Sequence, residues 1–274
     1  MQTYIRKNEL NQVRQAAVIA CSNGLSASGT EEVRHMQERL RARGIIAQDT
    51  GCIRAGADGR SGTAQQRAHA LMDCYKNPEI QAIFDVSGGD MANEVLPYLD
   101  FDTIARNRDT LFWGYSDLTV LLNAIYARTG NRGVLYHMPY EQGQDDLFCF
   151  DYSFLQGDGM QGIVTGGNLR CLLKLAGTRY FPDMRGKILF LEARSGGVPQ
   201  LITYLSQLQQ MGVFGQVSGI LLGTFTQMQR EQQAPAAEQL IQQFVPAGIP
   251  IAVTGQIGHA PQSRALMIGE SISL

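Results

Sequence analysis

The segment 111–119 constrains this chain most, because an apolar run passes through a small turn directly into a helical pattern. The run predicts a strand over residues 111–115. From Leu118 to Tyr126 apolar residues recur at intervals of three and four, which predicts a helix with one buried stripe, and Gly130 follows as a stop signal. Ser116 stands between strand and helix, where we expect it at the N-cap.

Two interpretations of Ser116 follow from this spacing. Strand, sharp turn, serine and helix together form a nucleophile elbow, although Leu118 replaces the second glycine of G-x-S-x-G. The unpaired N–H groups at the positive helix end, including that of Asp117, suit a developing oxyanion. Serine is also among the preferred N-caps, so a capping role without catalysis is the alternative.

The bulk properties indicate a globular protein with small partners. A length of 274 residues suits two modest domains, and a formal charge of −2 with mixed signs provides no basic surface for nucleic acid or an anionic membrane. The polar segment 8–15 and the short apolar run 16–21 do not match a secretory leader, so we expect a cytoplasmic protein.

The cysteines predict neither a disulfide framework nor a structural zinc site, and we expect no cofactor. They are five in number, widely spaced and without a C-x-x-C pair. Cys21 follows a predicted strand, which leaves open a thiol hydrolase, although such a cysteine is more often a small core residue.

The first half of the chain predicts a doubly wound parallel sheet. Strands 16–21, 80–86 and 111–115 alternate with helical patterns, one of which starts with the capping-box spacing of Ser28 and Glu31. Ligands gather at the carboxyl ends of such strands. Three residues fall on that edge: Ser22, Gly89 and Ser116.

The second half predicts a mixed α/β domain. Between residues 141 and 167 the pattern dissolves into Gln, Gly and Asp, so we divide the chain into an N-terminal domain 1–145, a connection 146–165 and a C-terminal domain 166–274. The elements expected after the connection are strands 187–192, 219–225 and 249–254, a helix starting at Pro199 and a helix over 236–244.

A nucleophilic serine needs a base and an orienting acid. Of the four histidines, His259 is the better base because it lies in a glycine-bearing loop after a strand, whereas His137 either lines a site or is structural. The remaining two, His35 and His69, lie in polar segments. Glu192 ends an apolar strand at the same sheet edge, and Asp85 is its rival.

Several motifs in this order resemble the LD-carboxypeptidase family of serine peptidases, which includes muropeptide LD-carboxypeptidases and microcin C self-immunity peptidases. The resemblance covers nearly the whole chain. It is carried by the segments 87–93, 96–100, 114–117, 166–169, 186–192 and 255–259.

The resemblance implies a Ser-Glu-His triad of Ser116, Glu192 and His259, with an oxyanion hole from the N–H groups of Gly89 and Asp117. It also implies a cytoplasmic homodimer without a metal, active in peptidoglycan recycling, that hydrolyses the bond before a terminal D-alanine in a murein tetrapeptide. We expect Arg194, Arg170 or Arg264 to bind the substrate carboxylate, and Tyr136 to contact the substrate.

Two other functions remain open. An immunity-type peptidase would cleave a peptide-nucleotide or aminoacyl-adenylate analogue and would need an aromatic platform for the base, for which Trp113 and Tyr136 are the candidates. A non-catalytic α/β protein would bind a small anion at residues 87–89, although the chain has no G-x-x-x-x-G-K-[ST] or G-x-G-x-x-G pattern. The segments after Gly89 and Glu192 differ from those of many family members.

Overall fold

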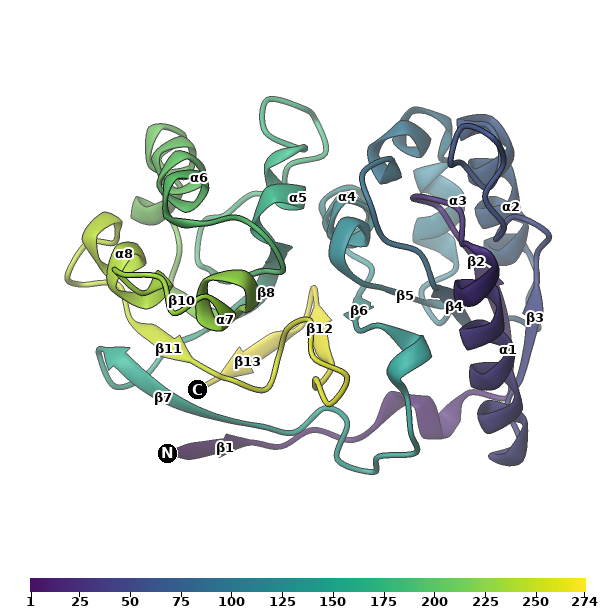
Figure 1. The fold of residues 1–274 in the computed structure, drawn as a ribbon, viewed down its shortest axis with the longest axis horizontal. Coiled ribbons are helices and arrows are strands. Elements are labelled where there is room, and N and C mark those ends of the chain that lie inside the picture. The colour runs from purple at the N-terminus through teal and green to yellow at the C-terminus, as the bar shows by residue number, and fades with distance from the viewer.

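The computed structural model describes all residues from 1 to 274 and contains two sheets, each flanked by helices (Figure 1). One sheet has six strands in the order β12-β6-β5-β4-β2-β3. The other has seven strands in the order β1-β7-β11-β10-β9-β8-β13. The expected α/β fold with two domains is confirmed.

The six-stranded sheet is the predicted doubly wound one. Strands β2 to β6 run parallel, and only β12 joins antiparallel, at the edge. The strand order reverses between β2 and β4, and ligands of such sheets bind beyond the carboxyl ends of the strands at that switch point. The strands are β2 (Gln15–Ile19), β3 (Ile46–Asp49), β4 (Ala82–Asp85), β5 (Leu111–Gly114), β6 (Gly133–Leu135) and β12 (Leu266–Ile268).

Helices cover both faces of this sheet because its strands are apolar on both sides. In β2, Val18 packs in the cluster that contains Met36 of α1, whereas Ile19 packs in the cluster that contains Leu71 of α2 and Leu121 of α4. The helices are α1 (Ala27–Ala42), α2 (Ala64–Lys76), α3 (Phe101–Arg106) and α4 (Thr119–Thr129), with 3-10 turns η1 (Glu9–Gln12), η2 (Ala92–Tyr98), η3 (Ser116–Leu118) and η4 (Met138–Tyr140).

The seven-stranded sheet has a parallel centre, β8 to β11, and antiparallel strands at both sides. Its strands are β1 (Gln2–Tyr4), β7 (Phe150–Gln156), β8 (Gln161–Asn168), β9 (Lys187–Ala193), β10 (Gly219–Phe225), β11 (Ile251–Val253) and β13 (Ser271–Ser273). Its helices are α5 (Leu169–Leu173), α6 (Val198–Gln210), α7 (Thr226–Arg230) and α8 (Ala237–Phe244), with the 3-10 turn η5 (Val213–Gly215).

The domains are not the contiguous halves that the sequence suggests. Residues 146–165, expected as a connection, contain β7 and the first part of β8. Strand β1 pairs with β7 in the seven-stranded sheet, and β12 pairs with β6 in the six-stranded sheet, so each end of the chain contributes to both parts. The polar composition of β7 misleads because its side chains alternate between buried and exposed, as in Phe150 and Tyr152 against Ser153.

Two local predictions need correction. The N-cap of α1 is Ser26, whose hydroxyl accepts from the N–H of Gly29, so the helix begins before the predicted capping box. Helix α4 has no single buried stripe, because all residues from Thr119 to Ile125 are buried. Their apolar members share one cluster with residues of both sheets, such as Phe112 and Phe190, so α4 lies inside the molecule at the boundary between the domains (Figure 1).

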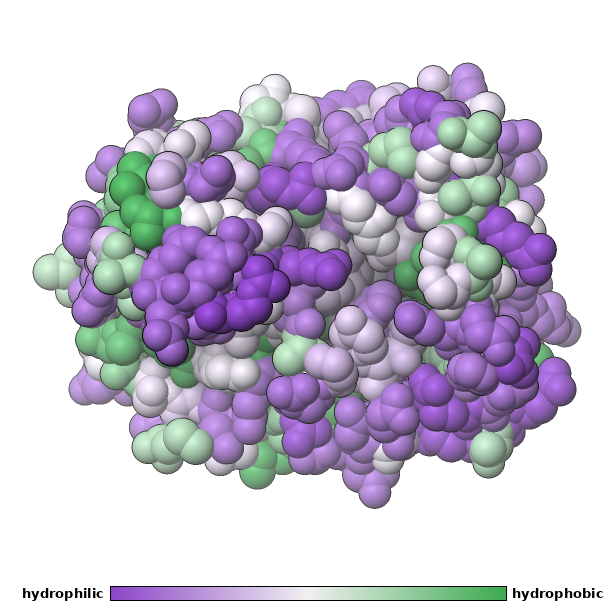
Figure 2. All heavy atoms as spheres, in the orientation of Figure 1, coloured by the Kyte–Doolittle hydropathy of each residue, from purple (hydrophilic) through white to green (hydrophobic).

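The surface is that of an ordinary globular protein on the face seen in Figure 2, where hydrophobic side chains lie in small separate groups among polar ones. The large hydrophobic side chains that are exposed are scattered along the chain: Met1, Ile5, Ile46, Tyr98, Leu155 and Ile202. None of the helices has the length and apolar character needed to cross a membrane.

Candidate active site

Ser116 stands at the sharp turn between β5 and α4. Its φ of 52° lies in the left-handed region, which costs a non-glycine residue about 1–3 kcal/mol. Tyr115 takes the N-cap position expected for Ser116, because Ser116 is itself the first residue of the 3-10 turn that precedes α4. The Ser116 hydroxyl makes no hydrogen bond within the chain and lines a cavity, which is the arrangement of a nucleophile elbow.

His259 and Glu192 are in direct contact. The loop between β11 and β12 carries His259, whose Nδ1 lies 2.7 Å from Glu192 Oε2. Glu192, near the end of β9, is fully buried. A carboxylate at Nδ1 favours the tautomer with its proton on that nitrogen, which leaves Nε2 as an acceptor. That Nε2 is buried and has no partner.

Asn168 holds the other oxygen of the same carboxylate, a contact that the sequence did not reveal. Its amide Nδ2 donates to Glu192 Oε1 at 2.9 Å. Asn168 and Glu192 are register partners on the neighbouring parallel strands β8 and β9. The sequence predicts the strand that ends near Glu192 but not β8, and the pairing of the two strands cannot be read from the sequence.

A cavity of about 280 Å³ brings Ser116 and His259 together. Both residues line it, together with Gly89, Arg194 and His137. No hydrogen bond joins the serine hydroxyl to the histidine in this structure. A second cavity of about 280 Å³ shares Ser116, Gly89 and Arg194 with the first, so the serine lies where two hollows meet.

The turn after β4 presents an unpaired backbone donor beside Ser116. No group accepts from the N–H of Gly89, whose φ is 122°. A Cβ at this position would lie 2.2 Å from Cγ of Asn23, so the structure requires glycine here because of Asn23 as well as because of the backbone angle.

Asp85, the rival acid, supports that turn and does not face the cavity. Its carboxylate accepts from the Cys21 N–H at 2.8 Å, and from the Ser87 N–H at 3.0 Å and hydroxyl at 2.6 Å. Burial raises the pKa of Asp85 to about 6. Asp85 thus ties together the loops after β2 and β4 at the switch point of the sheet.

The carboxylate of Asp117 contacts three other segments of the chain. It is fully buried and accepts from the Ser22 hydroxyl at 2.6 Å, from the Ala92 N–H at 2.9 Å and from the ammonium of Lys174. Lys174 follows α5 in the other domain, so the residue after the serine is anchored across the domain boundary.

Among the three arginines, only Arg194 has a side chain without a hydrogen-bond partner, and it lines both cavities. Arg170 is paired with Asp90, and Arg264 binds both carboxylate oxygens of Asp146, at 2.6 and 2.7 Å. The geometry therefore favours Arg194 as the free cation at the site.

Three residues considered from the sequence are buried away from the cavity. Tyr136 is 1 % exposed and packs with Trp113 and Phe148, so the expected substrate contact of Tyr136 is not supported. Trp113 is fully buried and offers no platform for a base. Burial raises the pKa of the Cys21 thiol well above its usual range, which disfavours a thiolate nucleophile.

His137 lines the cavity, as one of its two interpretations predicted. Its ring packs edge-on against Tyr140, with centroids 4.5 Å apart. Burial, together with the nearby His259 and Arg194, lowers the pKa of His137 to about 4. His137 is therefore neutral at physiological pH and contributes no charge to the site.

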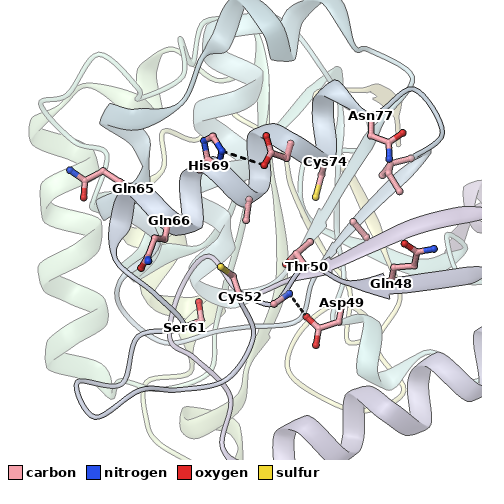
Figure 3. A pocket seen from close by; sticks show the side chains of 15 residues that line it. Gln48, Asp49, Thr50, Cys52, Ser61, Gln65, Gln66, His69, Cys74 and Asn77 are labelled. Atoms are coloured by element: carbon pink, nitrogen blue, oxygen red, sulfur yellow. Dashed lines mark hydrogen bonds and ion pairs between the residues drawn. The ribbon is translucent and has the colours of Figure 1, made fainter.

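A larger hollow lies elsewhere, between α2 and the edge strand β3 (Figure 3). This groove of about 850 Å³ contains His69, but that ring pairs with Asp73 on its own helix at 3.4 Å, and the hydroxyl of Ser61 donates to the carbonyl of Ala20 at 2.7 Å. Its lining holds no serine or cysteine hydrogen-bonded to a base. No group of three His, Cys, Asp or Glu side chains could hold a metal ion anywhere in the chain.

The family is shown by comparison with known proteins. Residues 16–136 match the LD-carboxypeptidase N-terminal domain, and residues 161–274 match the LD-carboxypeptidase C-terminal domain. The chain therefore belongs to the LD-carboxypeptidase family of serine peptidases, as the motifs indicate.

Relatives in this family have different named activities. The chain is 29% identical to the probable murein peptide carboxypeptidase of Bacillus subtilis over 241 residues, covering 78% of this chain and 75% of the relative. It is 27% identical over 243 residues to the murein tetrapeptide carboxypeptidase of Pseudomonas aeruginosa, covering 78% of each. The match to the microcin C7 self-immunity protein MccF of Escherichia coli is 29% identical over 213 residues, covering 60% of this chain and only 62% of that relative.

Solved structures share the fold over almost the whole chain. The MccF-like protein of Bacillus anthracis str. Ames superposes with a TM-score of 0.81 at 26% identity, covering 95% of this chain and 93% of the other. The muramoyltetrapeptide carboxypeptidase of Oxalobacter formigenes gives 0.78 at 22% identity, covering 94% of each.

Proposed function

We propose that this protein is a serine carboxypeptidase that hydrolyses the L,D-amide bond before the terminal D-alanine of cytoplasmic murein tetrapeptides. The observation that carries the proposal is the His259–Glu192 pair: Nε2 of His259 has no partner, and His259 lines the same cavity as Ser116, whose hydroxyl is also unpaired. The named activities of the B. subtilis and P. aeruginosa relatives support the substrate class.

In the proposed reaction His259 Nε2 takes the proton of the Ser116 hydroxyl as Oγ attacks the scissile carbonyl carbon. Glu192 holds the imidazolium that forms. The tetrahedral intermediate collapses when the C–N bond breaks and His259 returns the proton to the D-alanine amine. Water then attacks the acyl-enzyme with the same proton route and releases the shortened peptide.

Backbone donors of Gly89 and Asp117 form the proposed oxyanion hole. The Gly89 N–H has no acceptor in the chain, which leaves it free for the carbonyl oxygen as negative charge develops there. Asp117 follows the nucleophile directly, where α/β-hydrolases place one of their two donors.

Arg194 is the proposed partner of the substrate carboxylate. It lines both cavities beside Ser116 and has no acidic partner of its own, unlike Arg170 and Arg264. A guanidinium can bind a terminal carboxylate with two parallel hydrogen bonds. We expect R194M to raise KM for the tetrapeptide by at least tenfold, and R264M, which loses only a surface pair, to leave KM within twofold.

Mass spectrometry of a defined murein tetrapeptide incubated with the protein tests the proposal. We expect release of D-alanine by the wild type and a loss of several orders of magnitude in S116A. A parallel reaction with an aminoacyl sulfamoyl adenosine tests the activity suggested by the MccF relative. Cleavage of that compound alone would overturn the murein assignment, and equal turnover by S116A would overturn the serine mechanism.

The family likeness also leads us to propose that the protein forms a homodimer. Light scattering during gel filtration measures the mass of the assembly and tests this.

A further inference from the structure

The residue after the nucleophile carries a negative charge close to the proposed oxyanion hole. The carboxylate of Asp117 is fully buried, and its own backbone N–H is one of the two proposed donors. An uncompensated carboxylate there would repel the negative charge that develops on the carbonyl oxygen, because little water screens it.

Lys174 supplies the compensating charge from the other domain. Its ammonium pairs with Asp117 Oδ1 and donates to the carbonyl of Asp90 at 2.9 Å. The Lys174 side chain is 18% exposed, so most of this contact is shielded from solvent. One ammonium thus bridges the residue after Ser116 and the residue after Gly89.

Arg170, one helical turn earlier, holds the same turn from a second point. Its guanidinium pairs with the carboxylate of Asp90 and donates to the carbonyl of Gly89 at 3.0 Å. Asn168, which binds Glu192, caps the start of the same short helix, α5. Helix α5 and its two caps therefore contact the triad acid and both sides of the proposed oxyanion hole.

We propose that Lys174 is a positioning residue for the oxyanion hole: its ammonium neutralises Asp117 and fixes the Gly89–Asp90 turn relative to the nucleophile. The inference rests on the proposed function, since it concerns the same reaction. Lys174 lines neither cavity and makes no hydrogen bond to Ser116, so its effect passes through Asp117 and Asp90. This makes the C-terminal domain a contributor to oxyanion stabilisation as well as the source of Glu192 and His259.

The test compares two single variants. K174M removes the charge and the hydrogen bonds, and K174Q keeps a donor of similar length without the charge. We expect K174M to lower kcat by about tenfold to a hundredfold with KM within twofold, since the interaction matters when the oxyanion forms. We expect K174Q to be lowered nearly as much, because the charge is what balances Asp117.

The double variant D117N/K174Q separates this role from a purely structural one. The two neutral amides can hydrogen-bond to each other, and the oxygen left at position 117 can still accept from Ser22 and Ala92. We expect its kcat to recover to within about tenfold of the wild type. Binding of a tetrahedral boronate inhibitor is the second readout, and it should weaken in K174M while binding of the tripeptide product does not change.

K76M, at an exposed lysine on α2, is the matched control and should behave as the wild type. A K174Q with wild-type kcat, or a double variant no better than K174M, would overturn the inference. If K174M does not fold, K174Q and the double variant decide alone. An inactive wild type would instead count against the proposed function, and the boronate affinities would still report on the oxyanion hole.

Discussion

Ser116 combines a strained backbone with an unpaired hydroxyl. Its left-handed φ of 52° is uncommon for a residue with a Cβ, and the same conformation places the hydroxyl at the cavity. The sequence predicts that Ser116 lies in a turn, because a strand pattern and a helix pattern meet there. It could not predict the strain, which depends on the path of β5 into the sheet.

This strain has a measurable consequence for stability. S116G should be more stable than S116A by about 1 kcal/mol, because glycine adopts a positive φ without steric cost. Both variants lack the hydroxyl, so the comparison isolates the backbone. Chemical denaturation gives the two free energies of unfolding, and an S116A at least as stable as S116G would contradict the strained elbow.

The low pKa of His137 lowers the stability of the folded protein in acid. In the folded chain the pKa of His137 is about 4, below the usual 6.5. Between these two pH values the unfolded chain therefore binds a proton that the folded chain does not bind. Stability is therefore lost as pH falls from about 6.5 towards 4, by up to about 3 kcal/mol.

The variant H137Q, which cannot titrate there, isolates this effect because every other ionisable group is retained. The free energy of unfolding measured between pH 7 and pH 4 should fall more steeply for the wild type than for H137Q. Equal slopes would show that His137 is not held neutral by its surroundings.

Periodicity in the sequence predicts the positions of most strands and helices. The differences occur where tertiary packing determines the conformation or the burial of a segment. The strands at 187–192 and 219–225 are found as predicted, since continuous apolar runs suit a parallel sheet covered on both faces. Helix α4 does not have the single buried face that the sequence predicts, because both domains enclose it. The segment η2 (Ala92–Tyr98) is a 3-10 helix with Pro97 inside it.

The turn after β4 depends on Gly89. We expect G89A to lower the free energy of unfolding by at least about 2 kcal/mol, since the new Cβ combines a φ of 122° with a 2.2 Å approach to Asn23. G88A is the control, because a Cβ there meets only Ser116 Cβ at an ordinary 3.8 Å. Thermal melts of the two variants measure the difference, and equal melting temperatures would contradict the described turn.

For the whole molecule, the two domains share one hydrophobic cluster and are joined by polar contacts. The amide of Asn123 on α4 donates to the Gly166 carbonyl and accepts from the Gly166 N–H, both at 2.8 Å. Lys174 and Arg170 add charged contacts across the same boundary. The sequence indicated Arg170 only as one of three candidates for the substrate carboxylate and gave Lys174 no role, because contacts between residues distant in the chain leave no periodic signal.

Removing the Asn123 amide should destabilise the whole molecule. N123A leaves two buried backbone groups of Gly166 unpaired, which costs about 2–4 kcal/mol. N107A, which loses a single bond to the Thr103 carbonyl within one domain, should cost less than about 1.5 kcal/mol. Calorimetry should show a single transition shifted downward in N123A, and two separate transitions in the wild type would contradict a shared core.

We propose that side chains from two domains, Ser116 and His259 with its partner Glu192, act as one catalytic unit. Groups that act as a unit lose their effect together. The kcat/KM of S116A, H259A and the double variant S116A/H259A on the same tetrapeptide tests this most directly. We expect the double variant to be about as slow as either single variant. Losses that multiply, or an H259A close to the wild type, would contradict it.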